Sequence, residues 1–161
     1  MATISRFEDL LAFQKSRELV KMVYKEFTLC RDNGFKDQIQ RAGASVLSNI
    51  AEGFESGTRE RFLNYLHIAK ASAGEVRAQL YVASDVGYLN IETFKYLKGL
   101  VEECSKLIAS FIGKVKMGSM PGIQRKHGED KAEVFFAELL EKSGSVRLPN
   151  GQVVKKSSLN T

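Results

Sequence analysis

The stretch QIQRAGASVLSNIAEGF, residues Gln38–Phe54, carries two stripes of side chains at helical spacing. The first stripe is apolar and recurs every three or four residues, which places it on one face of a helix; its members are Ile39, Gly43, Val46, Ile50 and Phe54. The second stripe lies about 100° around the helix and consists of Gln38, Arg41, Ser45, Ser48, Asn49 and Glu52. A solvated helix face usually carries many Lys and Glu residues, whereas this stripe is small, polar and rich in amides. We therefore expect a helix whose polar side borders the core and forms a specific packing or binding surface.

A first helix is expected upstream of this stretch, starting after Ser5. Ser5 and Glu8 have the spacing of a capping box, and Asn33-Gly34 supplies residues that tolerate positive φ at its end. One face of this helix is apolar and is expected to be buried: Phe13, Val20, Tyr24 and Phe27. The quoted stretch then lies in a second helix, expected from about Phe35 to Phe54.

Two more amphipathic helices are expected downstream. Thr58 is a suitable N-cap for the third helix and Asn90 for the fourth, which runs to about Lys116. The third helix has a regular apolar stripe from Phe62 to Gly87 and a second stripe that is expected to be buried against another neighbour: Tyr65, Ile68, Ser72, Glu75, Gln79, Val82 and Val86. Four long helices with short connections predict an all-α fold, an antiparallel up-down four-helix bundle, over residues 1–116.

The character of the sequence changes after Lys116. Residues 117–128 contain three glycines and Pro121, which is typical of a linker. Residues 129–161 are expected to form a C-terminal extension, with a short helix ending near Lys142 and a β-hairpin around Asn150-Gly151. A two-stranded hairpin is marginally stable by itself in water, so this extension is expected to dock on something.

Composition places the chain among globular proteins and leaves its partners open. The formal net charge is +5, from 24 basic and 19 acidic residues. This excess permits nucleic-acid binding without requiring it, and it would grow in a homo-oligomer. Cys30 and Cys104 lack metal-ligand spacing, so free thiols in a reducing cytoplasm are expected. No stretch approaches the roughly 18 apolar residues of a membrane span, so a cytoplasmic protein without membrane contact is expected.

The order of two short motifs resembles a known bacterial family. The string Ser48-Asn49-Ile50-Ala51-Glu52-Gly53 is preceded by Arg41-Ala42 and Ser45, and Ala69-x-x-Ser72-x-x-Glu75 follows in the next helix. This combination is similar to the signature of a bacterial four-helix-bundle family whose members include proteins encoded in intervening sequences of 23S rRNA genes. The resemblance covers about residues 7–116. Ala71 departs from the pattern, where a Gly would be expected before the Ser.

The resemblance implies a four-helix bundle that assembles into a homopentameric ring. A related branch of the family is the accessory variability determinant of diversity-generating retroelements, a basic pentamer that works with a reverse transcriptase and its template RNA. The resemblance thus implies three partners: further copies of the chain, RNA or DNA, and a reverse transcriptase.

The polar residues of the second and third helices form the first candidate site, which we call the polar seam: Gln38, Arg41, Ser45, Asn49, Glu52, Ser72 and Glu75. It is either a recognition pocket or a hydrogen-bonded network between helices or subunits, because buried polar groups must find partners. If Arg41 pairs with Glu52 or Glu75 in the interior, removal of one partner would cost about 3–5 kcal/mol. On the network interpretation, Asn49→Ala and Glu75→Ala impair folding or assembly before any binding.

Seven basic residues are candidates for phosphate contacts: Arg59, Arg61, Lys70, Lys114, Lys116, Arg125 and Lys126. Arg59 and Arg61 lie at the start of the third helix, where free backbone N–H groups also favour anions. The alternative interpretation is an ordinary solvated surface.

A third candidate surface lies in the C-terminal extension, where four apolar side chains have no evident place in the bundle: Phe135, Phe136, Leu139 and Leu140. They either bind a partner protein or pack on the chain's own bundle or on a neighbouring subunit.

Enzyme chemistry finds little support. The chain has two histidines, His67 and His127, and lacks the Glu-x-x-His pairs of a di-iron bundle. No P-loop, nucleophile elbow or Cys-x-x-Cys motif occurs. We therefore expect no catalytic residues, no metal and no cofactor. The leading hypothesis is a non-catalytic oligomeric scaffold that binds RNA as an accessory factor, and the alternative is a protein-interaction adaptor that acts through residues 129–161.

Overall fold

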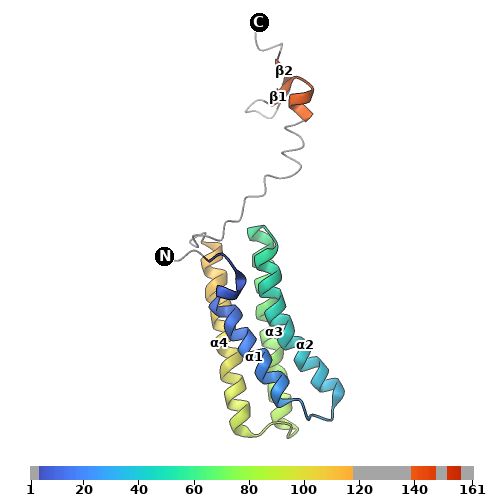
Figure 1. Ribbon diagram of the computed structural model, residues 1–161, viewed down its shortest axis with the longest axis vertical. Helices are drawn as coiled ribbons and strands as arrows, with labels where there is room; N and C mark the ends of the chain where they lie inside the picture. Colours follow the sequence, from blue (N-terminus) through green and yellow to red (C-terminus); the bar gives the residue numbers. More distant parts are fainter. Residues whose placement is uncertain (1–3, 118–138, 148–151, 157–161) are drawn as a thin grey trace. The chain divides into compact units, whose positions relative to one another are not determined.

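The computed structural model in Figure 1 describes residues 4–117, 139–147 and 152–156. The chain divides into two compact units, Met1–Arg125 and Lys126–Thr161. The division falls inside the segment 117–128 that the sequence predicts as a linker. The predicted Arg125, Lys126, Phe135 and Phe136 sites lie outside the described residues.

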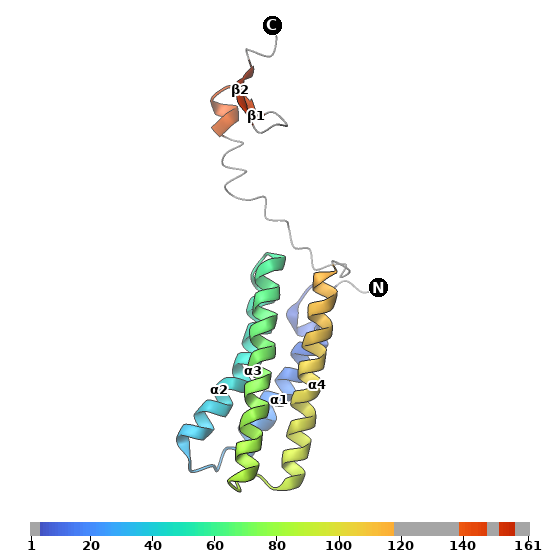
Figure 2. The same ribbon diagram turned by 180° about the vertical axis from the view of Figure 1, so that it is seen from behind.

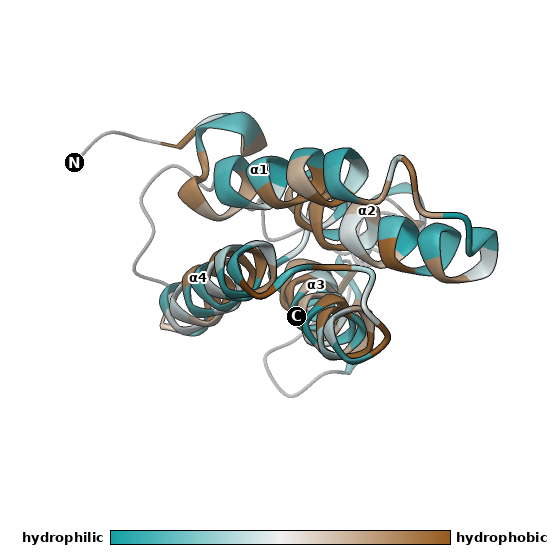
Figure 3. Cartoon of the chain, turned by 90° about the horizontal axis from the view of Figure 1, so that it is seen from below, coloured by the Kyte–Doolittle hydropathy of each residue, from teal (hydrophilic) through white to brown (hydrophobic). Residues whose placement is uncertain are grey.

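Four long helices make up the first unit, after a short 3-10 turn η1 (Phe7–Asp9). They are α1 (Leu11–Glu26), α2 (Asn33–Glu55), α3 (Arg59–Asp85) and α4 (Ile91–Lys116). Each helix packs on its neighbours in the chain and α4 packs on α1, so α1 and α3 occupy opposite corners (Figure 3). Successive helices run in opposite directions, as the two views of Figures 1 and 2 show. The predicted antiparallel four-helix bundle is confirmed.

Side-chain caps determine where three of the helices begin. Thr58 Oγ1 accepts a hydrogen bond from the backbone N–H of Arg61 at 3.3 Å, and Asn90 Oδ1 accepts one from Thr93 at 2.8 Å, as predicted. Helix α2 begins at Asn33, two residues before the predicted start at Phe35, because Asp32 is its N-cap. Asp32 Oδ1 accepts a hydrogen bond from the backbone N–H of Phe35 at 3.0 Å. These contacts satisfy backbone donors that the first turn of a helix leaves free.

The predicted capping box at Ser5 is wrong. Helix α1 begins only at Leu11 and has no side-chain cap. Leu10 adopts an extended conformation and is buried, which separates η1 from α1. The ring of Phe7 packs edge-on against Phe13, with ring centroids 4.8 Å apart. Aromatic packing at this end of the bundle therefore replaces the expected first helical turn.

The opposite end of the bundle is closed by a contact between two loops. The hydroxyl of Tyr88 donates to Asp32 Oδ2 at 3.0 Å, and the rings of Phe35 and Tyr88 have centroids 5.4 Å apart. The N–H of Phe35, followed by the Tyr88 hydroxyl, lowers the pKa of the Asp32 carboxyl below its ordinary value. Gly87 has a φ of 77°, in the left-handed region that glycine adopts readily, and allows the turn after α3.

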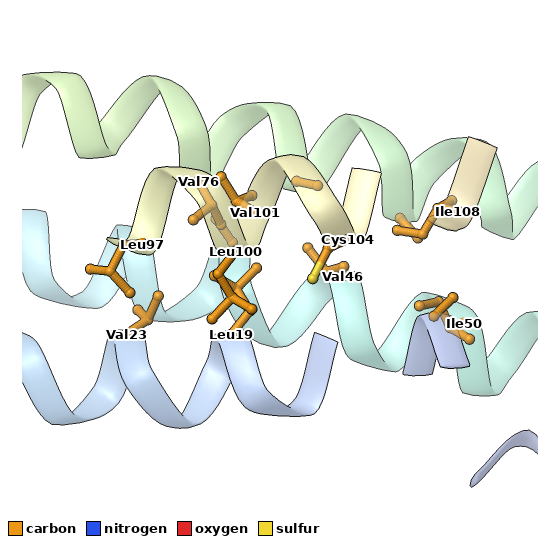
Figure 4. Close-up of a cluster of buried hydrophobic side chains, with 14 of the residues drawn as sticks. Leu19, Val23, Val46, Ile50, Val76, Leu97, Leu100, Val101, Cys104 and Ile108 are labelled. Atoms are coloured by element: carbon orange, nitrogen blue, oxygen red, sulfur yellow. The ribbon is translucent and has the colours of Figure 1, made fainter. Parts of the chain in front are cut away.

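All four helices contribute to one apolar core (Figure 4). The apolar stripe of α2 is buried as predicted at Ile39, Gly43, Val46 and Ile50. The predicted apolar face of α1 is wrong at Tyr24, whose side chain is 46% exposed. Tyr24 lies about 100° around the helix from the fully buried Val23, which carries it to the edge of the core.

Gly53 lies at a close approach of α2 to α3. A Cβ atom at this position would lie 2.7 Å from Cδ2 of Phe62 and 2.7 Å from Cβ of Tyr65. The Phe62 ring could move, but Cβ of Tyr65 is fixed to the backbone of α3. Only glycine therefore fits here without a shift of one helix.

The C-terminal unit contains a two-stranded antiparallel sheet, as the sequence predicts. Strand β1 (Ser145–Arg147) pairs with β2 (Val153–Lys155), and Val146 lies opposite Val154. Residues 139–142 are helical, and a turn at Ser143 and Gly144 follows them; Gly144 has a φ of 65°.

We predict that Gly53→Ala destabilises the bundle by about 1–3 kcal/mol, because the added methyl group overpacks the α2–α3 contact. Urea denaturation followed by far-UV circular dichroism measures this loss. Gly99→Ala is the matched control, since Gly99 lies inside α4 with no atom within 4 Å of an added Cβ. It should stabilise the protein by about 0.5–1 kcal/mol through helix propensity. Equal stability of the two variants would contradict the close approach.

Candidate interaction surfaces

The middle of the polar seam is a hydrogen-bonded chain that joins α2 to α3. Asn49 Nδ2 donates to the Ser45 carbonyl at 2.7 Å and to Ser45 Oγ at 3.0 Å. The hydroxyl oxygens of Ser45 and Ser72 are 2.8 Å apart, and Ser72 Oγ donates to the Ile68 carbonyl at 3.0 Å. Because the Ser72 hydroxyl donates its hydrogen to the Ile68 carbonyl, Ser45 is the donor in the hydrogen bond between the two hydroxyls. The chain therefore runs in one direction, from Asn49 through both serines to the backbone of α3.

The outer part of the polar seam lines a groove of about 410 Å³. Its walls come from α2 and α3, and its lining residues are Gly34, Gln38, Arg41, Ala42, Ser45 and Glu75. Gln38, Arg41 and Glu75 are exposed there, as is Glu52 farther along α2. Four members of the polar seam therefore line a surface groove, which differs from the interior network expected from the sequence; they are Gln38, Arg41, Ser45 and Glu75.

Arg41 does not form the interior ion pair that the sequence allowed. Its Nε lies 3.2 Å from Oδ2 of Asp37, one helical turn earlier, and the two side chains are 75% and 63% exposed. An exposed i,i+4 pair of this kind contributes little to stability. Glu75 instead accepts a hydrogen bond from Gln79 Nε2 at 3.1 Å. Within the described residues, Gln79 Oε1 is buried without a hydrogen-bond partner.

The second stripe of α3 is only partly buried, contrary to the expectation from the sequence. Ser72 and Gln79 are buried against α2, but Ile68, Val82 and Val86 are 49%, 48% and 53% exposed. Ala71 and Ala78 are exposed beside them. We call this exposed set, Ile68, Ala71, Ala78, Val82 and Val86, the apolar stripe of α3. It adjoins the groove, and no other helix of the bundle covers it in the described residues.

Four of the predicted basic residues share one end of the bundle. Arg59 and Arg61 begin α3, and Lys114 and Lys116 end the antiparallel α4. The described residues at this end also include Arg6 and five carboxylates, Glu8, Asp9, Glu52, Glu55 and Glu60, so the basic and acidic side chains are equal in number. The local field at this end is therefore close to neutral. Lys70 stands apart from this group, exposed in the middle part of α3.

The remaining candidate residues offer no reactive group. Burial raises the pKa of the Cys104 thiol to about 11, so this thiol is protonated at neutral pH. No group of three or more His, Cys, Asp or Glu side chains could hold a metal ion in the part of the chain that the structure describes. His67 is exposed on α3. In the C-terminal unit, Leu139 is 47% exposed and Leu140 is half-buried.

None of the helices within the described ranges is long and apolar enough to cross a membrane.

Comparison with known proteins finds relatives of the bundle. A family model described as 23S rRNA-intervening sequence protein matches residues 8–110. The chain is also similar to a solved structure of a protein with unknown function from the S23 ribosomal protein family of Bacteroides thetaiotaomicron VPI-5482. The two chains are 27% identical with a TM-score of 0.60, and the match covers 63% of this chain and 98% of the other. Among curated proteins, none matches.

We predict that Asn49→Ala lowers the free energy of unfolding by about 1 kcal/mol, because it removes one hydrogen-bond donor from the half-buried chain between α2 and α3. Glu75→Ala should change it by less than about 0.5 kcal/mol, because Glu75 is exposed. Thermal and urea unfolding of both variants measure these changes. Equal destabilisation by the two substitutions would show that the exposed rim of the polar seam carries as much of the fold as its buried middle.

Proposed function

This chain belongs to the 23S rRNA-intervening sequence protein family, and from this premise we propose that it is a non-catalytic helical scaffold that assembles with copies of itself and binds RNA. The observation that carries the proposal is the apolar stripe of α3, which the other helices of the bundle leave exposed. Large contiguous apolar surfaces on soluble proteins mark contacts with other molecules. A scaffold built from copies of one bundle would cover this stripe and leave the other helices free to bind.

Self-assembly is supported by the position of the apolar stripe. Its Ile68 and Val82 lie on either side of Glu75, each about two turns of α3 away from it, and the groove beside them adds polar groups that can fix a register. Close packing is also favoured by Ala71 and Ala78, because small side chains let another helix approach. Five copies is the stoichiometry that the resemblance to the pentameric branch suggests.

RNA binding is supported by the net charge of the assembled scaffold. A single chain has a formal net charge of +5, and five chains would together carry about +25. A ring of such charge attracts a phosphate backbone strongly and with little sequence preference. The finer proposal is that the scaffold is an accessory factor of a retroelement reverse transcriptase, and it rests on the resemblance to the accessory variability determinant alone.

A second candidate function is that of a protein-interaction adaptor acting through the C-terminal unit. Leu139 favours it, because this side chain is 47% exposed in the described part of that unit. On this alternative the bundle presents residues 129–161 to a partner protein and has no affinity for nucleic acid.

We predict salt-dependent RNA binding by the full-length chain. Fluorescence anisotropy with labelled 20-nucleotide single-stranded RNA and with a duplex of the same length should show binding at low salt. The logarithm of the affinity should fall linearly with the logarithm of the salt concentration, by about 0.7 per neutralised phosphate for single strands. Absence of binding at about 50 mM salt, where electrostatic attraction is only weakly screened, would contradict the RNA proposal and favour the adaptor.

We predict that Val82→Glu disrupts self-assembly, because it replaces an apolar side chain of the apolar stripe of α3, between Ala78 and Val86, by a charge. Size-exclusion chromatography with multi-angle light scattering should find an oligomer for the wild type and smaller species for this variant. Ser110→Glu is the matched control, since it adds the same charge at an exposed position of α4. A wild-type chain that is monomeric at about 100 μM would contradict the assembly role of the stripe, because a contact with a micromolar dissociation constant is occupied at this concentration. Equal behaviour of the two variants would contradict it as well.

A further inference from the structure

The outer face of α1 carries a row of cations that the sequence analysis did not select. Arg17, Lys21 and Lys25 follow one another at four-residue spacing, and all three are exposed. Tyr24 lies beside them with 46% of its side chain exposed. At about 100° per residue these four side chains fall within about a quarter to a third of the helix circumference. We call this set the basic face of α1.

The carboxylates of α1 do not interrupt this face. Helix α1 contains two acidic residues, Glu18 and Glu26. Glu18 points towards α4: its Oε1 accepts a hydrogen bond from the hydroxyl of Tyr96 of α4 at 3.4 Å, and its Oε2 lies 3.2 Å from Nζ of Lys15 of α1. Glu26 lies 3.9 Å from Nζ of Lys25, a separation at which an exposed ion pair contributes little. Cations therefore outnumber carboxylates on this side of α1, whereas they are balanced among the described residues at the end of the bundle that carries Arg59 and Lys116.

The dimensions of the basic face suit one nucleic-acid strand. With a rise of 1.5 Å per residue, Arg17 and Lys25 are about 12 Å apart along the helix axis. A row of this length spans a short run of phosphates, so its three cations can follow the backbone of one strand. Tyr24 stands between the cations of the row and offers an aromatic ring to the solvent. Alternating cations and an accessible ring are the features that bind single strands, whose bases are free to stack.

We propose that the basic face of α1 holds single-stranded RNA, with Arg17, Lys21 and Lys25 on the phosphates and Tyr24 stacked on a base. This assignment rests on the RNA-binding function proposed above and names its contact surface. Helix α1 lies at the corner of the bundle opposite α3 (Figure 3). The basic face of α1 therefore lies away from the apolar stripe of α3, and a copy that packs on that stripe does not have to cover the basic face of the same chain.

The assignment is tested with the triple variant Arg17→Gln/Lys21→Gln/Lys25→Gln in the full-length chain. Anisotropy with labelled 20-nucleotide oligouridine should show at least a tenfold loss of affinity at low salt. The slope of log affinity against log salt should fall by about 2, which is three lost phosphate contacts at about 0.7 each. Circular dichroism checks the fold, which should be unchanged because all three side chains are exposed.

The charge-matched control is Arg59→Gln/Arg61→Gln/Lys116→Gln, at the end of the bundle. It removes three positive charges as well, and it should reduce the affinity less than threefold. If both triple variants lose the same affinity, only the overall charge matters and the assignment is wrong. If the wild type binds no RNA at all, the proposed function fails and the assignment fails with it, so the two failures are distinguished by the wild-type measurement.

Stacking is tested separately with Tyr24→Ala and Tyr24→Phe. Tyr24→Ala should weaken binding of single-stranded oligouridine at least fivefold and leave binding of a duplex of the same length unchanged, because the bases of a duplex are not free to stack. Tyr24→Phe keeps the ring and should bind like the wild type. Equal effects of Tyr24→Ala on single-stranded and duplex RNA, or no effect on either, would overturn the stacking contact.

Discussion

The close approach of α2 to α3 at Gly53 is the constraint on which the rest of the bundle depends. A side chain at this position would collide with Phe62 and with Cβ of Tyr65, so α2 and α3 keep their separation here only because residue 53 is a glycine. Farther along the same pair of helices, the hydroxyl oxygens of Ser45 and Ser72 are 2.8 Å apart. Gly53, Ser45 and Ser72 thus each have a physical role in the contact between α2 and α3.

This constraint also decides which surfaces remain for function. In the middle of the polar seam, Asn49, Ser45 and Ser72 already bind one another. Its exposed members Gln38, Arg41 and Glu75 line the groove. The side of α3 that faces away from the core is left with Ile68, Val82 and Val86 exposed. The diagonal arrangement of α1 and α3 places the basic face of α1 on the other side. One bundle can therefore serve assembly and ligand binding with separate faces.

Periodicity predicted the fold well and the surfaces poorly, for different physical reasons. Apolar spacing and cap residues such as Thr58 and Asn90 are local properties, so they revealed four helices and two of their starts. Ser5 failed as a cap because the chain is extended at Leu10, and Phe7 packs there on Phe13 and on Phe54 of α2, a contact that spacing along the chain does not reveal. Whether Ile68 is covered, or whether Arg41 reaches Glu75 or only Asp37, depends on how neighbouring helices are rotated, and spacing within one helix does not encode that rotation. The basic face of α1 was missed for a related reason, because Tyr24 was counted as core.

We infer that the motif-bearing helices build the bundle while its outer faces assemble copies and hold RNA. Native mass spectrometry of the full-length chain, with and without a 20-nucleotide single-stranded RNA, measures both properties at once. We expect one dominant oligomer, of five copies according to the resemblance, whose mass increases by bound RNA while its copy number stays constant. A monomer that binds no RNA, or an oligomer that RNA dissociates into single chains, would contradict it.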